Sequence, residues 1–341
     1  MTQKMIKKAM VMAAGVGSRL EPLTLCTPKP LVPVANMPVM DILLMKLKSY
    51  GIESVIANTH YLAGQIQERY TKNSDLGLNF HYLHETELSG TAGGVKKCQF
   101  FFEDCDDFLV VSADGLHDAD LNRIIKSHYD NNAIATMAVI SVGLEEVPNY
   151  GVVVSSPEYF VEEFQEKPSI EAAKSNCINT GIYVFNKRIF DYIPENTKFD
   201  FAKDVFPALM AAGEKINTYK IYSYWSDIGT LDQYMQSNFD ALSNKVILNA
   251  NNIVRNLDTR YIAGKNTIID KSVQLIGNCV IGNNCKIGAN AVLKDAILWD
   301  NVEVSEGSRI ENSVVASNCI IKGSVKSEIV PQGKILETTY R

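Results

Sequence analysis

The sequence lacks several patterns that would point to common classes of protein. Its seven cysteines are an odd number, scattered along the chain and without a C-x-x-C pair, which argues against a disulfide framework and a zinc site. No apolar run approaches the roughly 20 residues that a membrane-spanning helix needs. The apolar run before Gly15 has only about six residues, too few for the core of a secretion signal. We therefore expect free thiols, a cytoplasmic location and no membrane partner.

The fraction of charged residues is also low, and acidic residues outnumber basic ones. The net charge is −6, with 21% charged and 46% hydrophobic residues. This composition gives ample material for a core and argues against a general nucleic-acid surface, so a phosphate site would have to be a local basic pocket. A length of 341 residues suggests about two domains.

Residues 8–33 carry the most informative pattern. A continuously apolar stretch ends at Ala14, as in a strand buried on both faces of a sheet, and Gly15, Gly17 and Ser18 follow it. Glycines after a strand can aim several backbone N–H groups at one anion. Arg19 and Lys29, the latter between two prolines, add two cations suited to phosphate. The alternative is a tight turn with two solvated charges, since a short glycine motif is a weak signal.

The known phosphate loops do not match this stretch. No Gly-Lys-Ser/Thr follows the glycines, and G-x-G-x-x-G is incomplete. Instead, G-x-G-S-R-L-x-P-L-T followed by P-K-P-L-V-P-V resembles the signature of the sugar-1-phosphate nucleotidyltransferases. The resemblance implies a triphosphate site that includes, on the nucleotide side, Ala14, Gly15, Gly17, Ser18, Arg19 and Lys29.

Alternating strand and helix patterns predict an α/β fold. Strands are expected at 52–58, 79–84, 107–113 and 137–142, with helices at 39–50 and 63–70. This order indicates a doubly wound, Rossmann-like sheet that is mixed but mostly parallel. We expect it to form a catalytic domain over residues 1–245.

A second glycine-rich stretch runs from 85 to 94, ETELSGTAGG, directly after an expected strand. It could bind a nucleobase edge or serve as a loop with capping groups. In the resembled family this loop contacts the base, which implies base-site roles for Glu85, Gly90 and Thr91.

Two aspartates are candidate metal ligands. Asp114 follows the expected strand at 107–113, and Asp227 lies in W-S-D-I-G-T. Mg²⁺ takes one or two protein carboxylates and completes its shell with phosphate and water. Each aspartate could instead cap a helix. The resemblance implies that both bind one Mg²⁺, although Ser112-Ala113-Asp114 departs from the Asn-Gly-Asp type expected there.

The sugar side is implied by three further motifs. They are N-Y-G-V-V at 149–153, Q-E-K-P at 165–168 and N-T-G-I-Y at 179–183. Glu-Lys-Pro alone would be an ordinary surface turn. In the family these segments hold the sugar phosphate, which implies roles for Tyr150, Gly151, Glu166, Lys167, Asn179 and Thr180. The F-x-K-D-x-F-P stretch at 201–207 is expected to be a structural helix start.

From about residue 248 apolar residues recur every six positions, with Ile-Gly steps at 281 and 287. This period predicts a left-handed parallel β-helix of three to four coils over residues 246–341, with a register slip at Ile276-Gly277. Open coil edges favour a homo-oligomer. No histidine follows His128, which argues against an acyltransferase.

The resemblance thus implies nucleotidyl transfer from a nucleoside triphosphate to a sugar 1-phosphate, with Mg²⁺ and release of pyrophosphate. The loop at 90–93 and the short hexapeptide tail most resemble mannose-1-phosphate guanylyltransferases, so GTP and mannose 1-phosphate are expected first. Thymidylyl-, uridylyl- and adenylyltransferases acting on glucose 1-phosphate share nearly all the motifs. A non-catalytic regulatory subunit that binds nucleotide sugars is the alternative of another class. The implied catalytic residues are Arg19, Lys29, Asp114 and Lys167.

Overall fold

A computed structural model describes residues 5–72, 76–248, 253–256 and 259–337 of the chain. The chain forms two compact units that interleave in sequence. One contains Met1–Val16 and Leu43–Asp227, and the other contains Gly17–Ile42 and Ile228–Arg341. The division into 1–245 and 246–341 stays a prediction beside these units.

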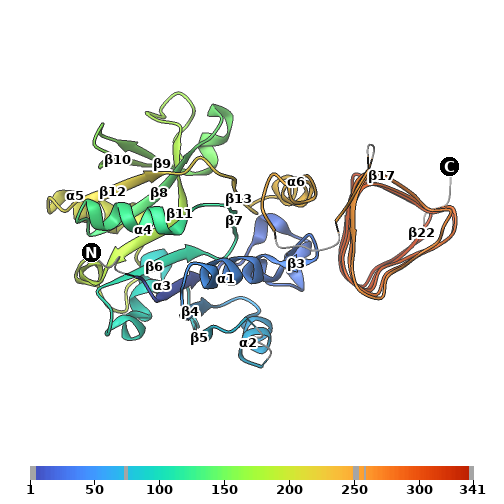
Figure 1. Cartoon of the computed structure of the whole chain (residues 1–341), viewed down its shortest axis with the longest axis horizontal. Coiled ribbons are helices and arrows are strands. Elements are labelled where there is room, and N and C mark those ends of the chain that lie inside the picture. The colour runs from blue at the N-terminus through green and yellow to red at the C-terminus, as the bar shows by residue number, and fades with distance from the viewer. Residues whose placement is uncertain (1–4, 73–75, 249–252, 257–258, 338–341) are drawn as a thin grey trace. The chain divides into compact units, whose positions relative to one another are not determined.

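The first unit is built on a mixed sheet, nine-stranded within the described residues (Figure 1). Along its main path the strands are β10 (Val161–Glu166), β9 (Gly151–Ser155), β11 (Cys177–Asn186), β6 (Asp107–Ser112), β1 (Lys8–Met12), β4 (Ser54–Thr59) and β5 (Asn79–His84). β8 (Ala135–Ser141) also pairs with β11, and β12 (Ile216–Lys220) pairs with β8. The predicted α/β fold is therefore confirmed.

Strand β1 is central because it is apolar on both faces. Its residues Ala9, Met10 and Val11 are fully buried between β4 and β6, and both pairings are parallel. Parallel pairing brings the carboxyl ends of β1, β4 and β6 to one edge of the sheet, where α/β folds place their ligands. The helices are α1 (Val39–Ser49), α2 (Ala63–Lys72), α3 (Gly90–Lys97), α4 (Leu121–Asp130), α5 (Phe206–Ala211) and α6 (Leu231–Leu242).

The sheet is less uniformly parallel than the sequence suggests. β11 runs antiparallel to β6, β8 and β9, and β10 runs antiparallel to β9. The short β7 (Gly115–His117) and β13 (Trp225–Asp227) form a separate antiparallel pair. Antiparallel insertion matters for the site, because it lets segments distant in sequence reach the carboxyl end of β6.

The C-terminal part of the second unit is the expected left-handed parallel β-helix, which has three sides in cross-section (Figure 1). Gln274 pairs with Val292 and Val292 with Arg309, so one coil takes 18 and then 17 residues. Three six-residue units per coil explain the repeat read from the sequence. The strands of one sheet are β14 (Val254–Arg255), β15 (Thr259–Ala263), β17 (Gln274–Ile281), β19 (Val292–Leu298), β21 (Arg309–Val315), β23 (Ser324–Lys326) and β24 (Ile329–Val330). Those of the other are β16 (Ile268–Ile269), β18 (Lys286–Ile287), β20 (Glu303–Val304), β22 (Ile320–Lys322) and β25 (Ile335–Glu337).

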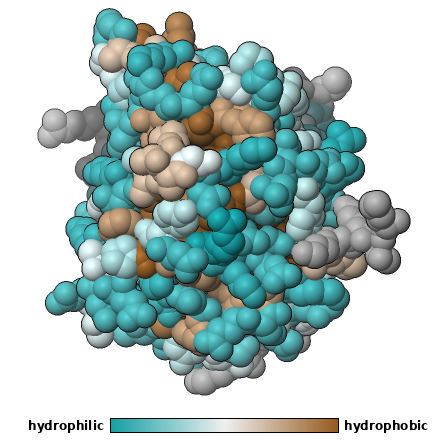
Figure 2. Space-filling view, turned by 90° about the vertical axis from the view of Figure 1, so that its left-hand side faces the viewer, coloured by the Kyte–Doolittle hydropathy of each residue, from teal (hydrophilic) through white to brown (hydrophobic). Residues whose placement is uncertain are grey.

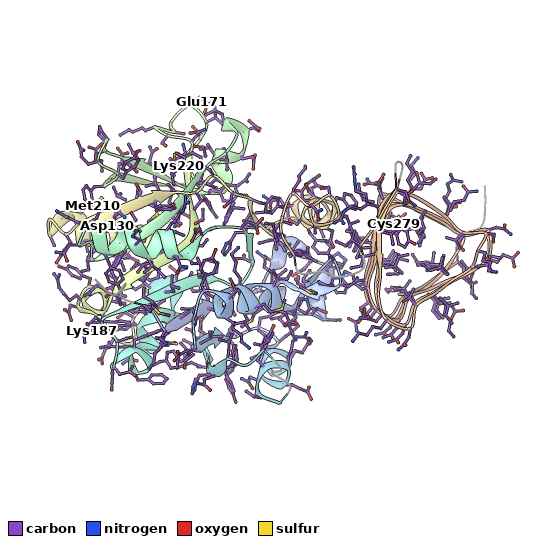
Figure 3. The ribbon with its side chains drawn as sticks, in the orientation of Figure 1. Asp130, Glu171, Lys187, Met210, Lys220 and Cys279 are labelled. Atoms are coloured by element: carbon purple, nitrogen blue, oxygen red, sulfur yellow. The ribbon has the colours of Figure 1, made fainter. Side chains whose placement is uncertain are left out.

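The register slip predicted near Gly277 is present. The β17–β19 pairing shifts between Ile276 and Cys279, and Gly277 has φ +69°. A Cβ at this glycine would lie 2.3 Å from the Asp295 carboxylate, so the coil turns there only with glycine. Cys279, labelled in Figure 3, is fully buried among the apolar side chains inside the coil.

The outer surface is mainly polar on the side drawn in Figure 2, where hydrophilic residues cover most of the face. All seven cysteines are free thiols. No helix in the described part of the chain is long and apolar enough to cross a membrane.

Candidate active site

The glycine loop of the second unit is held in one conformation by local contacts. Gly17 is left-handed, with φ 72° and ψ 28°, and its carbonyl accepts hydrogen bonds from Leu20 N at 3.0 Å and from Thr24 Oγ1 at 2.9 Å. A Cβ at Gly17 would lie 2.9 Å from the Cβ of Lys29. Glycine is therefore required both for the backbone conformation and for the approach of Lys29.

The cations of this segment sit on short, stiff structure. Arg19 lies in a 3₁₀ turn whose Leu20 is buried, and its own side chain is exposed, as is that of Ser18. Lys29 begins a second 3₁₀ turn, Lys29–Leu31, closed by the bond from Val32 N to Lys29 O at 3.1 Å. Prolines on both sides of Lys29 restrict the backbone. The backbones of Arg19 and Lys29 are therefore both held by local structure, and their role in binding a triphosphate stays a prediction.

The residues just after β1 belong to the first unit. Ala14 is buried, whereas Gly15 is exposed, and a Cβ at Gly15 would meet nothing within 4 Å. Ala13 N donates to the Oδ1 of Asn58, the amide side chain near the end of β4, at 3.0 Å. The loop thus leaves β1 along a defined path with open space beside it.

Asp114 and Asp227 come together through the small β7–β13 pair. Asp227 is the cross-strand partner of Gly115, the residue after Asp114. The Tyr150 hydroxyl donates to Asp227 Oδ1 at 2.7 Å and so orients that carboxylate. Within the described residues no group of three or more His, Cys, Asp or Glu side chains could hold a metal. Two aspartates on neighbouring segments nevertheless fit a hard divalent cation that takes its remaining oxygens from phosphate and water.

The unusual Ser112 is accommodated by Gly181 on the neighbouring strand. Gly181 has φ +74°, and a Cβ there would lie 2.4 Å from Ser112 Oγ. Ala113 N still donates to Met12 O at 3.1 Å, so β6 ends in regular pairing with β1. The residue before Asp114 is therefore still held by pairing with β1.

The sugar-side residues are brought together by antiparallel pairing. Glu166 is the cross-strand partner of Gly151, and Lys167 N donates to Tyr150 O at 3.1 Å. The side chains of Glu166 and Lys167 are both exposed. Ile178 pairs with Val152, which places Asn179 at the same end of the sheet. These segments, far apart in sequence, thus line one region of the first unit.

Two predicted sugar ligands have internal bonds in the structure. Thr180 is buried and its hydroxyl donates to Ala138 O at 2.7 Å, while its carbonyl accepts from Trp225 Nε1 at 3.1 Å. Asn179 donates to Tyr183 Oη at 2.6 Å and accepts from Gly181 N at 3.0 Å. Thr180 therefore ties the W-S-D segment to β11, a link with no signal in the sequence.

Glu85 is buried, and its carboxylate is bonded to neighbouring residues of the protein. The residue is 2% exposed, and its carboxylate accepts from Asn58 Nδ2 at 2.7 Å, from Lys97 Nζ at 3.1 Å and from both the backbone N–H and the hydroxyl of Ser89. Burial alone would raise the pKa of Glu85, but the bonds from Ser89, Asn58 and Lys97 outweigh it and hold that pKa below its ordinary value. The ionised group joins β4 to the start of α3.

The Gly90-Thr91 turn is clamped to a later segment. Phe199 O accepts from Ala92 N at 3.1 Å, and a Cβ at Gly90 would lie 2.3 Å from that oxygen. The Thr91 hydroxyl donates to Asp200 Oδ2 at 2.9 Å. Asp200 caps the π-helix Phe201–Val205, so the F-A-K-D-V-F-P motif has the structural role predicted for it. Sequence reasoning missed Asn58, Lys97 and Asp200, although an amide at the end of an apolar strand was a usable signal for the first.

His117, beside this site on β7, is buried with an unpartnered Nε2 in the part of the chain described. Burial, and secondly the charge of Lys46, lower its pKa to about 3. The imidazole is therefore neutral at physiological pH.

Two family models match this chain. The family model described as nucleotidyl transferase matches residues 8–244, and the one described as EIF2B subunit epsilon LbH domain matches residues 242–339. The chain belongs to the nucleotidyl transferase family.

Relatives of this nucleotidyl transferase carry several substrate names. A UTP–glucose-1-phosphate uridylyltransferase of Synechocystis sp. is 33% identical, over 90% of this chain and 87% of its own length. A mannose-1-phosphate guanylyltransferase of Mycobacterium tuberculosis is 32% identical, over 89% and 82%. A glucose-1-phosphate adenylyltransferase of Clostridium novyi is 29% identical, over 90% and 85%. Among these relatives the chemistry is shared and the base and sugar differ.

A solved structure agrees at the level of the fold. HddC of Yersinia pseudotuberculosis is 24% identical, with a TM-score of 0.60, and the match covers 68% of this chain and 98% of that one. The fold of this chain is therefore shared with that solved structure.

Proposed function

We propose that this nucleotidyl transferase converts GTP and mannose 1-phosphate into GDP-mannose and pyrophosphate. The observation that carries the reaction class is the pairing of Asp227 with Gly115, which brings the backbone of Asp227 opposite the residue that follows Asp114, just beyond the carboxyl end of β6. The sugar-side cluster around Gly151 and Glu166 lies in the same unit. A carboxylate pair beside polar, exposed side chains suits a phosphorylated sugar.

The chain's groups act mainly by positioning and by neutralising charge. Arg19 and Lys29, with the backbone of Ala14, Gly15, Gly17 and Ser18, would hold the triphosphate. Lys167 would hold the sugar 1-phosphate while an oxygen of that phosphate attacks the α-phosphorus of the nucleoside triphosphate. The new O–P bond forms as the bond to the β-phosphate oxygen breaks, and pyrophosphate leaves with that electron pair. Glu166 and Asn179 would orient the sugar hydroxyls, with Thr180 supporting their strand.

Asp114 and Asp227 would hold Mg²⁺, and Tyr150 would keep Asp227 aimed at it. When bound, the cation supplies positive charge for the phosphate oxygens. No general base is required from the chain, since a phosphate monoester is largely dianionic at neutral pH. The lowered pKa of His117 makes its imidazole a weak base, which is consistent with a reaction that needs no general base.

Support for guanine comes from the resemblance of the loop at 90–93 to that of the mannose-1-phosphate guanylyltransferases. Glu85 supports this loop, since its carboxylate is bonded to Asn58, Lys97 and Ser89. The M. tuberculosis relative carries the guanylyltransferase name.

The alternatives are glucose-1-phosphate uridylyl, adenylyl or thymidylyl transfer, and a regulatory subunit without catalysis. We would measure pyrophosphate release with Mg²⁺ for five nucleoside triphosphates against several sugar 1-phosphates, each scored against triphosphate alone. Clear preference for GTP with mannose 1-phosphate is the expected result. Preference for UTP with glucose 1-phosphate would overturn the guanylyl assignment, and a silent grid with nucleotide sugars still binding would favour the regulatory subunit.

We also propose a cytoplasmic homo-oligomer assembled through the β-helix. Ile268 and Ile335, on one sheet of the β-helix, are 66% and 62% exposed. Sedimentation of the full chain should give a mass above one copy, and replacing Ile335 with Asp should lower it. A monomer at micromolar concentration would contradict the assembly.

A further inference from the structure

A hydrogen-bond chain within the second unit joins the β-helix to the signature segment. The indole Nε1 of Trp299 donates to the hydroxyl of Tyr234 at 2.8 Å, and that hydroxyl donates to Pro33 O at 2.9 Å. The two rings meet edge to face, 6.5 Å between centroids. Trp299 is 4% exposed and Tyr234 is fully buried. A polar relay this deeply buried holds its members in fixed positions.

Trp299 departs from the pattern of its own corner in the β-helix. The successive coils place Gly264, Gly282, Trp299 and Ala316 at one stacked position, each donating its N–H to the following coil. Small residues occupy the other three places. A large indole in one coil is therefore not needed to build the β-helix. Its N–H instead donates a hydrogen bond to Tyr234 of α6.

The same corner holds the signature segment at a second point. Asn36 Nδ2 donates to Ile281 O at 2.7 Å, and Asn238 Oδ1, one turn beyond Tyr234 on α6, accepts from Ala35 N at 2.9 Å. Asn36 has φ 66°, in the hairpin between β2 (Pro33–Val34) and β3 (Met37–Pro38). The hairpin is thus held from two sides.

This hairpin follows directly on the segment that carries Lys29. Pro33 lies four residues after Lys29, and Pro30 and Pro33 leave the backbone between them little freedom. Lys29 in turn packs against Gly17, with a Cβ-to-Cβ approach of 2.9 Å if Gly17 carried a side chain. Movement of the Pro33 carbonyl would therefore displace both the cation and the glycine loop.

We infer that Trp299, Tyr234 and Asn36 are positioning residues through which the β-helix sets the geometry of the triphosphate-binding segment. The inference rests on the proposed function, since it assigns Lys29 and Gly17 to the triphosphate. It gives the β-helix a part in nucleotide affinity, beyond any part in assembly.

The test uses the full-length protein with Tyr234→Phe, Trp299→Phe and the double variant. Calorimetric titration with GTP and Mg²⁺ gives Kd without turnover, and kinetics give KM for each substrate. We expect Tyr234→Phe to raise the Kd and KM for GTP about tenfold, since small displacements of binding groups are costly. The KM for mannose 1-phosphate should stay unchanged. The double variant should resemble Tyr234→Phe alone, because both substitutions break one relay.

Asn36→Gly provides a milder variant should the buried substitutions impair folding, since glycine keeps the left-handed backbone and removes only the amide. Its control is Asn290→Gly in a left-handed corner of the β-helix with φ 58°. Weaker GTP binding in Asn36→Gly alone supports the inference. Lowered melting temperatures with GTP Kd unchanged in every variant would overturn it.

Absence of turnover in the wild type would count against the proposed function only. GTP Kd values that still respond to Tyr234→Phe would then support the positioning role independently. If GTP does not bind the wild type, titration with the triphosphate that binds best replaces it, with the same expected shift.

Discussion

At the scale of single residues, Asp227 is the most direct test of the candidate metal site. Asp227→Asn keeps the side-chain shape and an oxygen that can accept from Tyr150, but it removes the charge. Mg²⁺-dependent turnover should fall on the order of 100-fold or more, measured by pyrophosphate release. Asp232→Asn, an exposed aspartate in the first turn of α6, is the control and should be neutral. Turnover at the wild-type rate in Asp227→Asn would remove Asp227 from the metal site.

Glu85 should make a pH-dependent contribution to stability. Its folded-state pKa is lowered, so its stabilisation is present in full above the ordinary pKa and is lost as pH falls through the folded pKa. Glu85→Gln should lower the free energy of unfolding by about 1–3 kcal/mol at pH 7, because donors from Ser89 and Lys97 lose a charged acceptor. The difference from wild type should shrink in acid.

Urea denaturation at pH 7 and near pH 3 measures both effects, with the exposed Glu87→Gln as the control. A difference from wild type that is independent of pH would show that the charge of Glu85 does not stabilise the fold.

At the scale of elements, two glycines distinguish the cost of a left-handed backbone from the effect of the close approach between Gly17 and Lys29. Gly17 and Gly213 both have φ +72°, but a Cβ at Gly213 meets nothing within 4 Å whereas one at Gly17 meets Lys29. Each Gly→Ala change should cost about 1–2 kcal/mol for the left-handed backbone. Gly17→Ala should in addition weaken GTP binding, measured by titration. Equal behaviour of the two variants would mean that the approach to Lys29 has no functional weight.

Short antiparallel elements account for much of what sequence reasoning could not predict. The β7–β13 pair spans three residues on each strand and carries no strong periodicity, yet it places Asp227 opposite Gly115, the residue after Asp114. Likewise the clamp between Thr91 and Asp200 links residues 109 positions apart. Local propensity cannot signal such pairs, because their partners are chosen by the packing of the whole sheet.

At the scale of the whole molecule, the metal should serve activity and not folding. The cores of both units are apolar, and the described residues offer the cation two carboxylates without a third ligand nearby. A cation so held depends on the nucleotide for its remaining oxygens. EDTA should therefore abolish turnover and leave the melting temperature unchanged, as followed by calorimetry. A fall of several degrees in EDTA would indicate a structural metal.

The sequence by itself determined the order of the elements, the β-helix and the reaction class. Buried strands, glycine turns and a six-residue repeat are local patterns, and the signature motif is contiguous. Only the tertiary structure decided the contacts: Glu85 turned inward to Asn58 and Lys97, Thr180 bonded to Ala138, and Trp299 reached Pro33 through Tyr234. Their donors and acceptors lie far apart in sequence, and a buried polar group bonds to whichever partner the packed fold brings within reach.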